Sequence, residues 1–159
     1  MKELFLGLLL LQGVAMAVDE FYFHHKRGLG LWESIGHPLD TLTVIIAFFV
    51  VYLFPAAAGF KVLFIGLSIF SCVFVTKDEF VHQKLCSWQE NWVHAFLFMA
   101  HPLLFVCAFF IWSGNAHENF FLGLNFKDFI FIHLLVLTSF AMYQLIYWNK
   151  KRLYGLIKN

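Results

Sequence analysis

Two copies of one spacing of histidines and glutamates occur in this chain, 57 residues apart. Each copy has the form His-x7-Glu-x3-His, and their members are His25, Glu33 and His37, and then His82, Glu90 and His94. Imidazole nitrogens and carboxylate oxygens are ligands for iron, zinc and manganese. The repeated spacing therefore predicts a metal site.

An Asp-Glu-Phe triplet precedes each copy and supplies a further carboxylate, Glu20 or Glu79. Glutamate and histidine four residues apart share one face of a helix, as in Glu33 and His37. We expect two metal ions, with iron as the first choice and zinc or manganese as alternatives. The expected ligands are Glu20, His25, Glu33, His37, Glu79, His82, Glu90 and His94.

Two assignments stay open at this point. The register of the repeat pairs His25 with His82, whereas helical spacing from Glu20 favours His24. Asp40, three residues after His37, is either a further ligand or a group that orients an imidazole.

The composition is that of an integral membrane protein. Of the 159 residues, 61% are hydrophobic and 13% are charged, against about half and about a quarter in soluble domains. The net charge of +1, with scattered basic residues, gives no indication of nucleic-acid binding. We expect a single membrane domain over residues 1–159 with the lipid bilayer as its main partner.

Five apolar segments are long enough, at about 20 residues, to cross the bilayer. They cover residues 3–24, 38–55, 58–81, 90–113 and 126–148. The stretch from Leu4 to Phe23 also has features of a secretory signal peptide, but its length fits a first transmembrane helix. Proline is favoured at the first position of a helix, and a helix starting at Pro38 would leave Glu33 and His37 in a loop.

The motif copies divide the chain into two helical hairpins, at about residues 1–56 and 57–113, and an extra helix at about 126–148. Because each unit has an even number of helices, the two repeats are expected to be parallel, related by an axis along the membrane normal. The predicted fold is an all-α four-helix bundle with a fifth helix outside or alongside it.

The basic residues predict the orientation of this bundle. Eight Lys and Arg residues fall on one side of the five-span arrangement and three on the other. Since the cytoplasmic side carries the excess of Lys and Arg, the C-terminus and both motif copies are expected in the cytoplasm. The N-terminus is then outside the cell membrane.

Glutamate and histidine on helix ends give the chain a resemblance to the ferritin-like di-iron carboxylate bundles, whose helices contribute Glu and Glu-x-x-His ligands. Glu79-Phe-Val-His82 has that spacing, and three other Glu–His pairs have one residue more. The chain is also similar to the histidine-rich membrane oxygenases, such as desaturases and hydroxylases, although their HxxxH and HxxHH clusters are absent. We therefore expect a di-iron oxidoreductase that acts on a lipid-soluble substrate at the cytoplasmic face and takes electrons from a separate donor.

Other functions remain open. A small chain without a soluble domain also fits a non-enzymatic metal carrier, a sensor, or a structural protein that a metal ion holds together. A closed zinc site would favour these functions. His101 and His133 could ligate heme b in an electron-transfer subunit, line a proton or substrate path, or be hydrogen-bonded packing residues. Trp residues near helix ends, among them Trp112 and Trp148, are expected to form interfacial belts.

Overall fold

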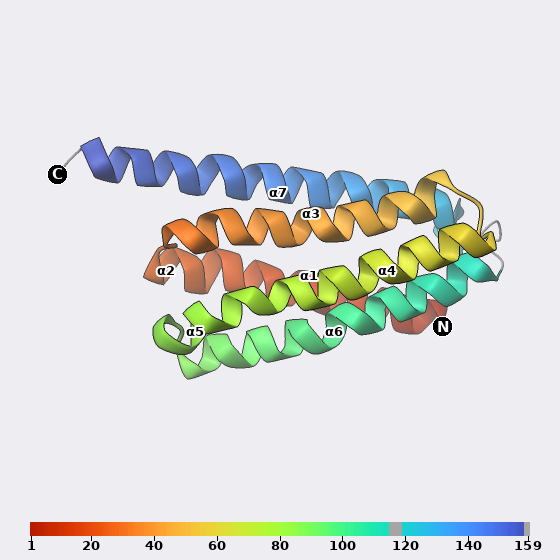
Figure 1. Ribbon diagram of the computed structural model, residues 1–159, viewed down its shortest axis with the longest axis horizontal. Coiled ribbons are helices and arrows are strands. Elements are labelled where there is room, and N and C mark those ends of the chain that lie inside the picture. The colour runs from red at the N-terminus through yellow and green to blue at the C-terminus, as the bar shows by residue number, and fades with distance from the viewer. Residues whose placement is uncertain (115–118, 158–159) are drawn as a thin grey trace.

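The computed structural model describes residues 1–114 and 119–157, most of which are helical (Figure 1). The helical elements are α1 (Lys2–Val18), the π-helical turn η1 (Asp19–His24), α2 (His25–Arg27), α3 (Leu31–Leu53), α4 (Ala58–Phe74), the 3-10 turn η2 (Val75–Asp78), α5 (Glu79–Leu85), α6 (Trp88–Ser113) and α7 (Phe126–Ile157). Two short antiparallel strands, β1 (Asn119–Phe121) and β2 (Leu124–Asn125), precede α7.

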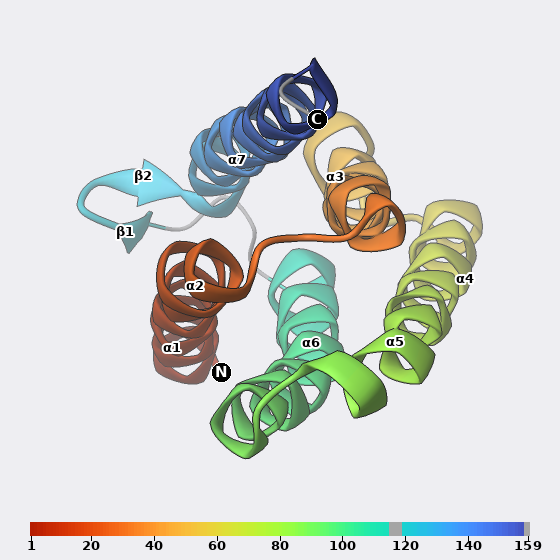
Figure 2. The same cartoon turned by 90° about the vertical axis from the view of Figure 1, so that its left-hand side faces the viewer.

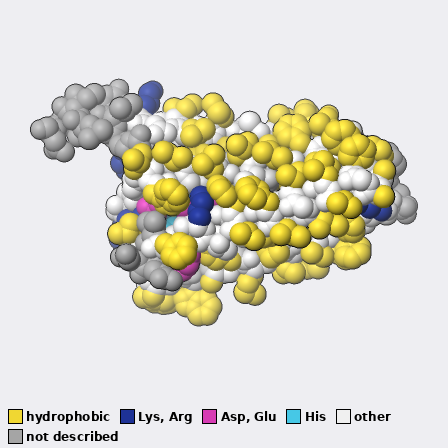
Figure 3. Space-filling model, viewed as in Figure 1, with side chains coloured by type: hydrophobic (Ala, Val, Ile, Leu, Met, Phe, Trp, Pro, Cys, Tyr) yellow, Lys and Arg dark blue, Asp and Glu magenta, His cyan; other side chains and the backbone are white. Residues whose placement is uncertain are grey.

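Five helical segments are long and apolar enough to cross a membrane, which confirms that part of the prediction. They are Lys2–Arg27, Leu31–Leu53, Ala58–Asp78, Trp88–Ser113 and Phe126–Lys151. Large apolar side chains cover much of their outer surface (Figure 3). Leu10, Val62 and Val136, for example, are each at least 60% exposed. An apolar surface of this extent is unusual for a protein in water.

The second of these helices begins at Leu31 instead of Pro38. Gly28, with a φ of 81°, ends the preceding helical segment. The Glu33 side chain then accepts a hydrogen bond of 3.2 Å from the Gly30 N–H at the N-cap. Pro38 therefore lies inside the helix, a position that membrane helices tolerate, and Glu33 keeps its helical relationship to His37.

Seen from the end, the five long helices follow one another around the molecule in the order α7, α3, α4, α6 and α1 (Figure 2). α3 packs against α4 and α7, and α6 packs against α1 and α4. Two aromatic contacts join α7 to the N-terminal helical segment, one at the start of α1 and one in η1. Phe5 contacts Phe126 (5.7 Å between ring centroids), and Phe21 contacts Tyr143 (5.6 Å).

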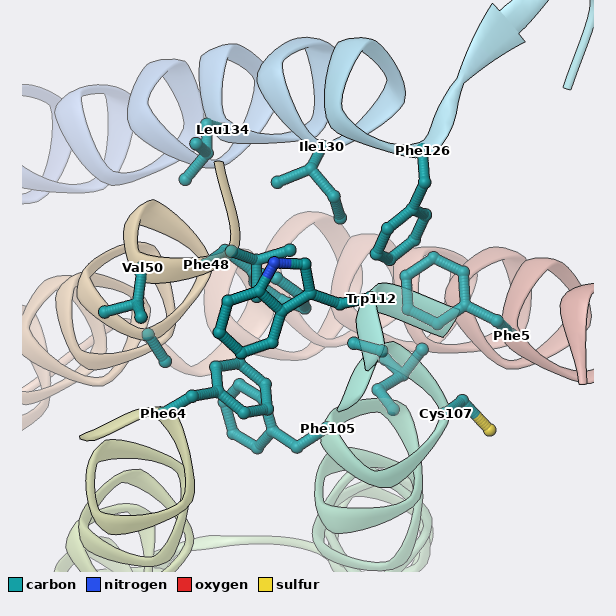
Figure 4. Packing of buried hydrophobic residues seen from close by; sticks show 14 of the residues in the cluster. Phe5, Phe48, Val50, Phe64, Phe105, Cys107, Trp112, Phe126, Ile130 and Leu134 are labelled. Carbon is teal, nitrogen blue, oxygen red and sulfur yellow. The ribbon is translucent and has the colours of Figure 1, made fainter. Parts of the chain in front are cut away.

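The hydrophobic core occupies the half of the bundle where α1 and α7 begin (Figure 4). Phe5, Phe64, Phe105 and Trp112 at its centre are at most 4% exposed. The Trp112 indole N–H donates to the Phe54 carbonyl over 3.3 Å. This tryptophan is buried among other side chains, whereas the sequence predicts that it lies in an interfacial belt. The opposite half of the bundle is where the polar groups gather.

Candidate metal centre

Four chain segments at that opposite end each bury one carboxylate beside one imidazole. The segments are η1, the start of α3, η2 with α5, and the start of α6. Seven of the eight residues are buried, and the side chain of His37 is 14% exposed. Ionisable side chains are buried to this extent only when they are paired or bind metals. The pairs are Asp19 and His24, Glu33 and His37, Asp78 and His82, and Glu90 and His94.

The π-helical turn explains why His24 belongs to this cluster. His24 follows Asp19 by five residues, whereas His82 follows Asp78 by four. A π-helical turn accommodates one extra residue, because its hydrogen bonds span five residues instead of four. Both pairs can therefore present their side chains to the bundle interior, although the two motif copies differ in length here.

Three of the eight predicted ligands lie outside the four pairs: Glu20, which borders the cluster beside His24, and His25 and Glu79. The exposed ring of His25 stacks on Tyr147 (5.0 Å between centroids), and its Nδ1 lies 2.9 Å from the carbonyl oxygen of Glu20. Glu79 is partly exposed and belongs to none of the groups of described residues that could share a metal ion. The neighbours Asp19, His24 and Asp78 occupy the corresponding places.

We expect His24→Gln and His25→Gln to differ in metal binding. His24 brings a buried ring nitrogen to the cluster and His25 does not, so only His24→Gln should weaken binding, by about 100-fold or more. Titration of the metal-free variants with Fe(II) or Zn(II) measures this difference. Weakened binding in His25→Gln with unchanged binding in His24→Gln would contradict the assignment.

The first group that could hold a metal ion combines η1 and α6. One ligand atom from each of Asp19, His24, Glu90 and His94 lies within 4.8 Å of the others. Asp19 Oδ1 is 3.1 Å from His94 Nε2, and Asp19 Oδ2 is 3.2 Å from His24 Nε2. Two carboxylates and two imidazoles are enough protein donors for a four-coordinate metal ion.

The second group combines α3 and α5. Its members are Glu33, His37 and His82, again with ligand atoms within 4.8 Å of one another. His82 Nε2 lies 3.6 Å from Glu33 Oε1, and His37 Nδ1 lies 3.8 Å from Asp78 Oδ2. Asp78 therefore adds a second carboxylate at the edge of this group. Each group takes one carboxylate–imidazole pair from each motif copy.

The four imidazoles form a row through both groups. Their ring centroids are 4.8 Å apart for His24 and His37, 5.9 Å for His37 and His82, and 4.1 Å for His82 and His94. Five of their buried ring nitrogens have no hydrogen-bond partner within residues 1–114 and 119–157. Burial, with a contribution from His94, lowers the pKa of His82 to about 4, so this ring is neutral at physiological pH. A neutral imidazole is the form that binds metal ions.

The Arg27 guanidinium joins the two groups. It donates to Glu33 through Nη1 (2.9 Å) and Nη2 (2.8 Å), and to Glu90 through Nη2 (2.8 Å) and Nε (3.2 Å). Charge-assisted, bidentate bonds of this kind are strong and geometrically specific. In the sequence, Arg27 contributes only to the charge bias across the membrane, and no spacing marks it as the partner of Glu33 or Glu90.

Lys77 supplies a second positive charge beside the second group. Its Nζ lies 2.6 Å from Asp40 Oδ1 and 3.1 Å from Asp78 Oδ2. The Trp32 indole N–H also donates to Asp78, over 3.0 Å. Asp40, Asp78 and His37 are close enough to form a further candidate group, which places Asp40 next to the predicted ligands.

Glu20 is held by α7 and contacts the cluster through His24. Its Oε1 accepts a hydrogen bond from the Trp148 indole (2.6 Å), and its Oε2 accepts one from Gln144 (3.0 Å). Glu20 Oε2 also lies 3.3 Å from His24 Nδ1. This arrangement orients His24 with Nε2 toward Asp19, as carboxylates commonly do for metal-binding imidazoles. Trp148 is 3% exposed. It is buried against Glu20, whereas the sequence predicts that it lies in an interfacial belt.

Cys86 forms an overlapping group with His82 and His94. Burial raises the pKa of its thiol to about 12. Because the thiolate is the form that binds metals, the protonated Cys86 is a weaker candidate than the carboxylates around it.

A cavity of about 1110 Å³ extends from this cluster between α1, α3, α6 and α7. Asp19, His24 and His94 line one end, and Glu3 and Phe121 line the other. The walls between these ends are mainly apolar side chains. Pockets for drug-sized ligands have volumes of about 300–1,000 Å³, so this cavity can hold a large lipophilic molecule.

The cavity opens between α1 and α7. Leu10 and Val14 on α1, and Ile132 and Val136 on α7, line the cavity and are also exposed on the outer surface. These residues lie between the two aromatic contacts, that of Phe5 with Phe126 and that of Phe21 with Tyr143. The mouth is therefore apolar and faces sideways from the middle of the bundle.

His101 and His133 line the same cavity from α6 and α7. His101 Nε2 lies 3.0 Å from Ser71 Oγ, and the His133 ring meets Phe48 edge-to-face at 5.4 Å. Ligation of heme b by these two histidines stays a prediction. The visible absorption spectrum of the purified protein would test it.

Comparisons with models of known protein families, with curated proteins and with solved structures find no match. The resemblance to di-iron carboxylate bundles therefore rests on residue types and spacing alone, and Glu79 of the Glu-x-x-His element lies outside the groups of described residues that could hold a metal ion. The fold and the site define a helical protein that has five helices able to cross a membrane and buried side-chain groups that could hold a metal ion at one end.

Proposed function

We propose that the protein is a membrane-embedded di-metal oxidoreductase, with iron as the favoured metal, that acts on a lipid-soluble substrate. The observation that carries this proposal is the apolar cavity that leads from the outer surface to both ligand groups. A structural or transport site needs no such cavity beside it, and a structural zinc site is closed by four protein ligands.

Charge balance supports the presence of more than one metal ion. Among the side chains that the structure describes, Arg27 and Lys77 are the cations in contact with the carboxylates of the cluster. With neutral imidazoles and five ionised carboxylates, these two cations leave three negative charges, more than one divalent ion would balance. The five carboxylates are those of Asp19, Glu20, Glu33, Asp78 and Glu90.

Placement of the bundle in a membrane follows from its apolar surface and its charged ends. Lipid would cover the exposed Leu, Val, Ile and Phe side chains of the five long helices. The end with the ligand groups carries most of the Lys and Arg residues, so the positive-inside rule favours a cytoplasmic site and an N-terminus outside the cell membrane. The basic residues at that end include Lys26, Arg27, Lys77, Lys150 and Lys151.

In this proposal, iron would supply the activation of dioxygen, and the chain would bind the metal ions and the substrate. The eight paired carboxylates and imidazoles would hold the metal ions, and Glu20 orients His24. The cavity excludes water and aligns an apolar substrate with the two ligand groups. The electrons come from a separate donor protein or a reduced cofactor.

Elemental analysis of the purified protein, with absorption spectra of the reduced form before and after exposure to air, tests the proposal. We expect two iron ions per chain and a spectrum that changes with oxygen. Zinc with no response to oxygen would favour a non-enzymatic metal protein, and a Soret band would favour the heme alternative. Absence of bound metal from the wild type and from Glu90→Ala alike would contradict every di-metal function.

A further inference from the structure

The charges around the cavity restrict the headgroup of its ligand. Among the described residues that line it, the acidic ones are Glu3, Asp19, Glu20, Asp40 and Asp78, and none is a lysine or an arginine. In the metal-free protein, a carboxylate or phosphate headgroup would therefore be buried without a counter-charge, at a large cost in free energy. An uncharged lipophilic molecule meets no such penalty.

A hydrogen-bond chain determines which group His101 offers to a ligand. The Thr43 hydroxyl donates to the Asp40 carbonyl (2.7 Å), so its only proton is used there. Ser71 must then donate to Thr43 Oγ1 (2.7 Å), and Ser71 Oγ accepts from His101 Nε2–H (3.0 Å). In a neutral imidazole with the proton on Nε2, Nδ1 is an acceptor.

The acceptor on His101 has no partner of its own within the part of the chain that the structure describes. His101 is 8% exposed and lines the cavity, and its hydrogen bond to Ser71 uses Nε2. A ligand in the cavity that carries an O–H group would satisfy Nδ1. His133, across the cavity on α7, makes a ring contact to Phe48 and offers a second imidazole to the same ligand.

The position of these histidines gives the depth of the polar group. His101 is seven residues beyond His94 on α6, which corresponds to about 10 Å along the helix. His133 is eleven residues before Gln144, whose amide contacts Glu20, or about 16 Å along α7. A hydroxyl bound here would lie roughly 10–16 Å from the metal centre, with the apolar part of the molecule between them.

We propose that the cavity binds an uncharged, long-chain lipid with a hydroxyl group, and that this hydroxyl donates a hydrogen bond to His101 Nδ1. The inference rests on the proposed function for the reaction itself, because the apolar chain then presents a carbon to the metal centre. The binding step can be tested in protein from which metal has been removed.

Photocrosslinking with two matched probes tests the inference. The probes are a sixteen-carbon alcohol and the corresponding carboxylic acid, each with a diazirine in the middle of the chain. Both are added at pH 8 to metal-free protein in phospholipid nanodiscs, and the labelled peptides are identified by mass spectrometry. We expect the alcohol to label the cavity-lining parts of α1, α6 and α7 at least about tenfold more than the acid.

Variants of His101 test the hydrogen bond itself. His101→Phe should reduce labelling by the alcohol about three- to tenfold, as loss of one hydrogen bond predicts. His101→Gln should retain most of it, because an amide can donate to Ser71 and accept from the ligand. Unlabelled hexadecanol should compete in the wild type better than hexadecane, a comparison that does not depend on how either variant folds.

Equal labelling by acid and alcohol, or equal competition by hexadecanol and hexadecane, would overturn the inference. Metal content is measured separately on the same preparations. If the native protein contains no metal but prefers the alcohol, the proposed oxidoreductase function is contradicted and the lipid site is supported. If the native protein contains metal but shows no preference for the alcohol, the lipid site is contradicted and the proposed function is not.

Discussion

His82→Ala is expected to bind one metal ion per chain where the native protein binds two. His82 belongs to the second group, and both of its ring nitrogens are buried without a hydrogen-bond partner among the described residues. Loss of this ligand leaves Glu33 and His37 as the remaining pair, so affinity at that position should fall by more than about 100-fold. Elemental analysis after dialysis at low free metal concentration measures the change.

His94→Ala is the matched variant for the first group, because His94 contributes the corresponding imidazole from the other helix pair. It should also leave one ion per chain, and the double variant should leave none. His133→Ala removes an imidazole that lies in the cavity and outside both groups, so its metal content should equal that of the native protein. Two tightly bound ions in His82→Ala would contradict the assignment of the second group.

Arg27→Met is expected to destabilise the metal-free protein strongly. Glu33 and Glu90 are 0% and 2% exposed, and Arg27 is their shared cationic partner. Removal of one partner from a buried ion pair costs about 3–5 kcal/mol, because it leaves a buried charge without compensation. Thermal unfolding of the metal-free protein, followed by tryptophan fluorescence, should show a clearly lower midpoint.

Added divalent metal should restore much of this loss, since a bound cation can neutralise Glu33 and Glu90 in place of the guanidinium. The exposed Lys26, which contacts the Tyr22 ring, provides the control variant Lys26→Met, and its midpoint should change little. An unchanged midpoint for metal-free Arg27→Met would mean that these two glutamates do not depend on Arg27 for their burial.

Hydropathy predicts the five long helices because each needs about 20 apolar residues and the chain contains five such runs. It does not predict where α3 begins. Pro38 is a favoured first residue, yet the hydrogen bond between Gly30 and Glu33 moves the start to Leu31. A capping contact of one side chain outweighs the preference of the proline.

The site residues that could be predicted are those whose spacing repeats in the two motif copies. Glu33, His37, His82, Glu90 and His94 all belong to the two groups. His24 replaces the predicted His25 because a π-helical turn shifts the register by one residue, and no regular helical spacing reveals such a turn.

Partners that come from distant parts of the chain could not be predicted. Arg27 reaches Glu90 across 63 residues, and Trp148 reaches Glu20 across 128. Both contacts depend on how helices pack, which hydropathy and motif spacing do not specify. The position of Trp148 near a helix end therefore predicts an interfacial residue, although its indole N–H is buried against the Glu20 carboxylate.

Each ligand group combines one carboxylate–imidazole pair from each motif copy, which has a consequence for how such a centre could arise. η1 joins α6 in the first group, and α3 joins α5 in the second, so neither half of the chain holds a complete set of ligands. One copy alone would carry two half-sites, and two identical copies facing each other would complete both. This division of the ligands is what fusion of two copies of a homodimeric subunit into one polypeptide would produce, and the extra residue of η1 is a difference between the two halves.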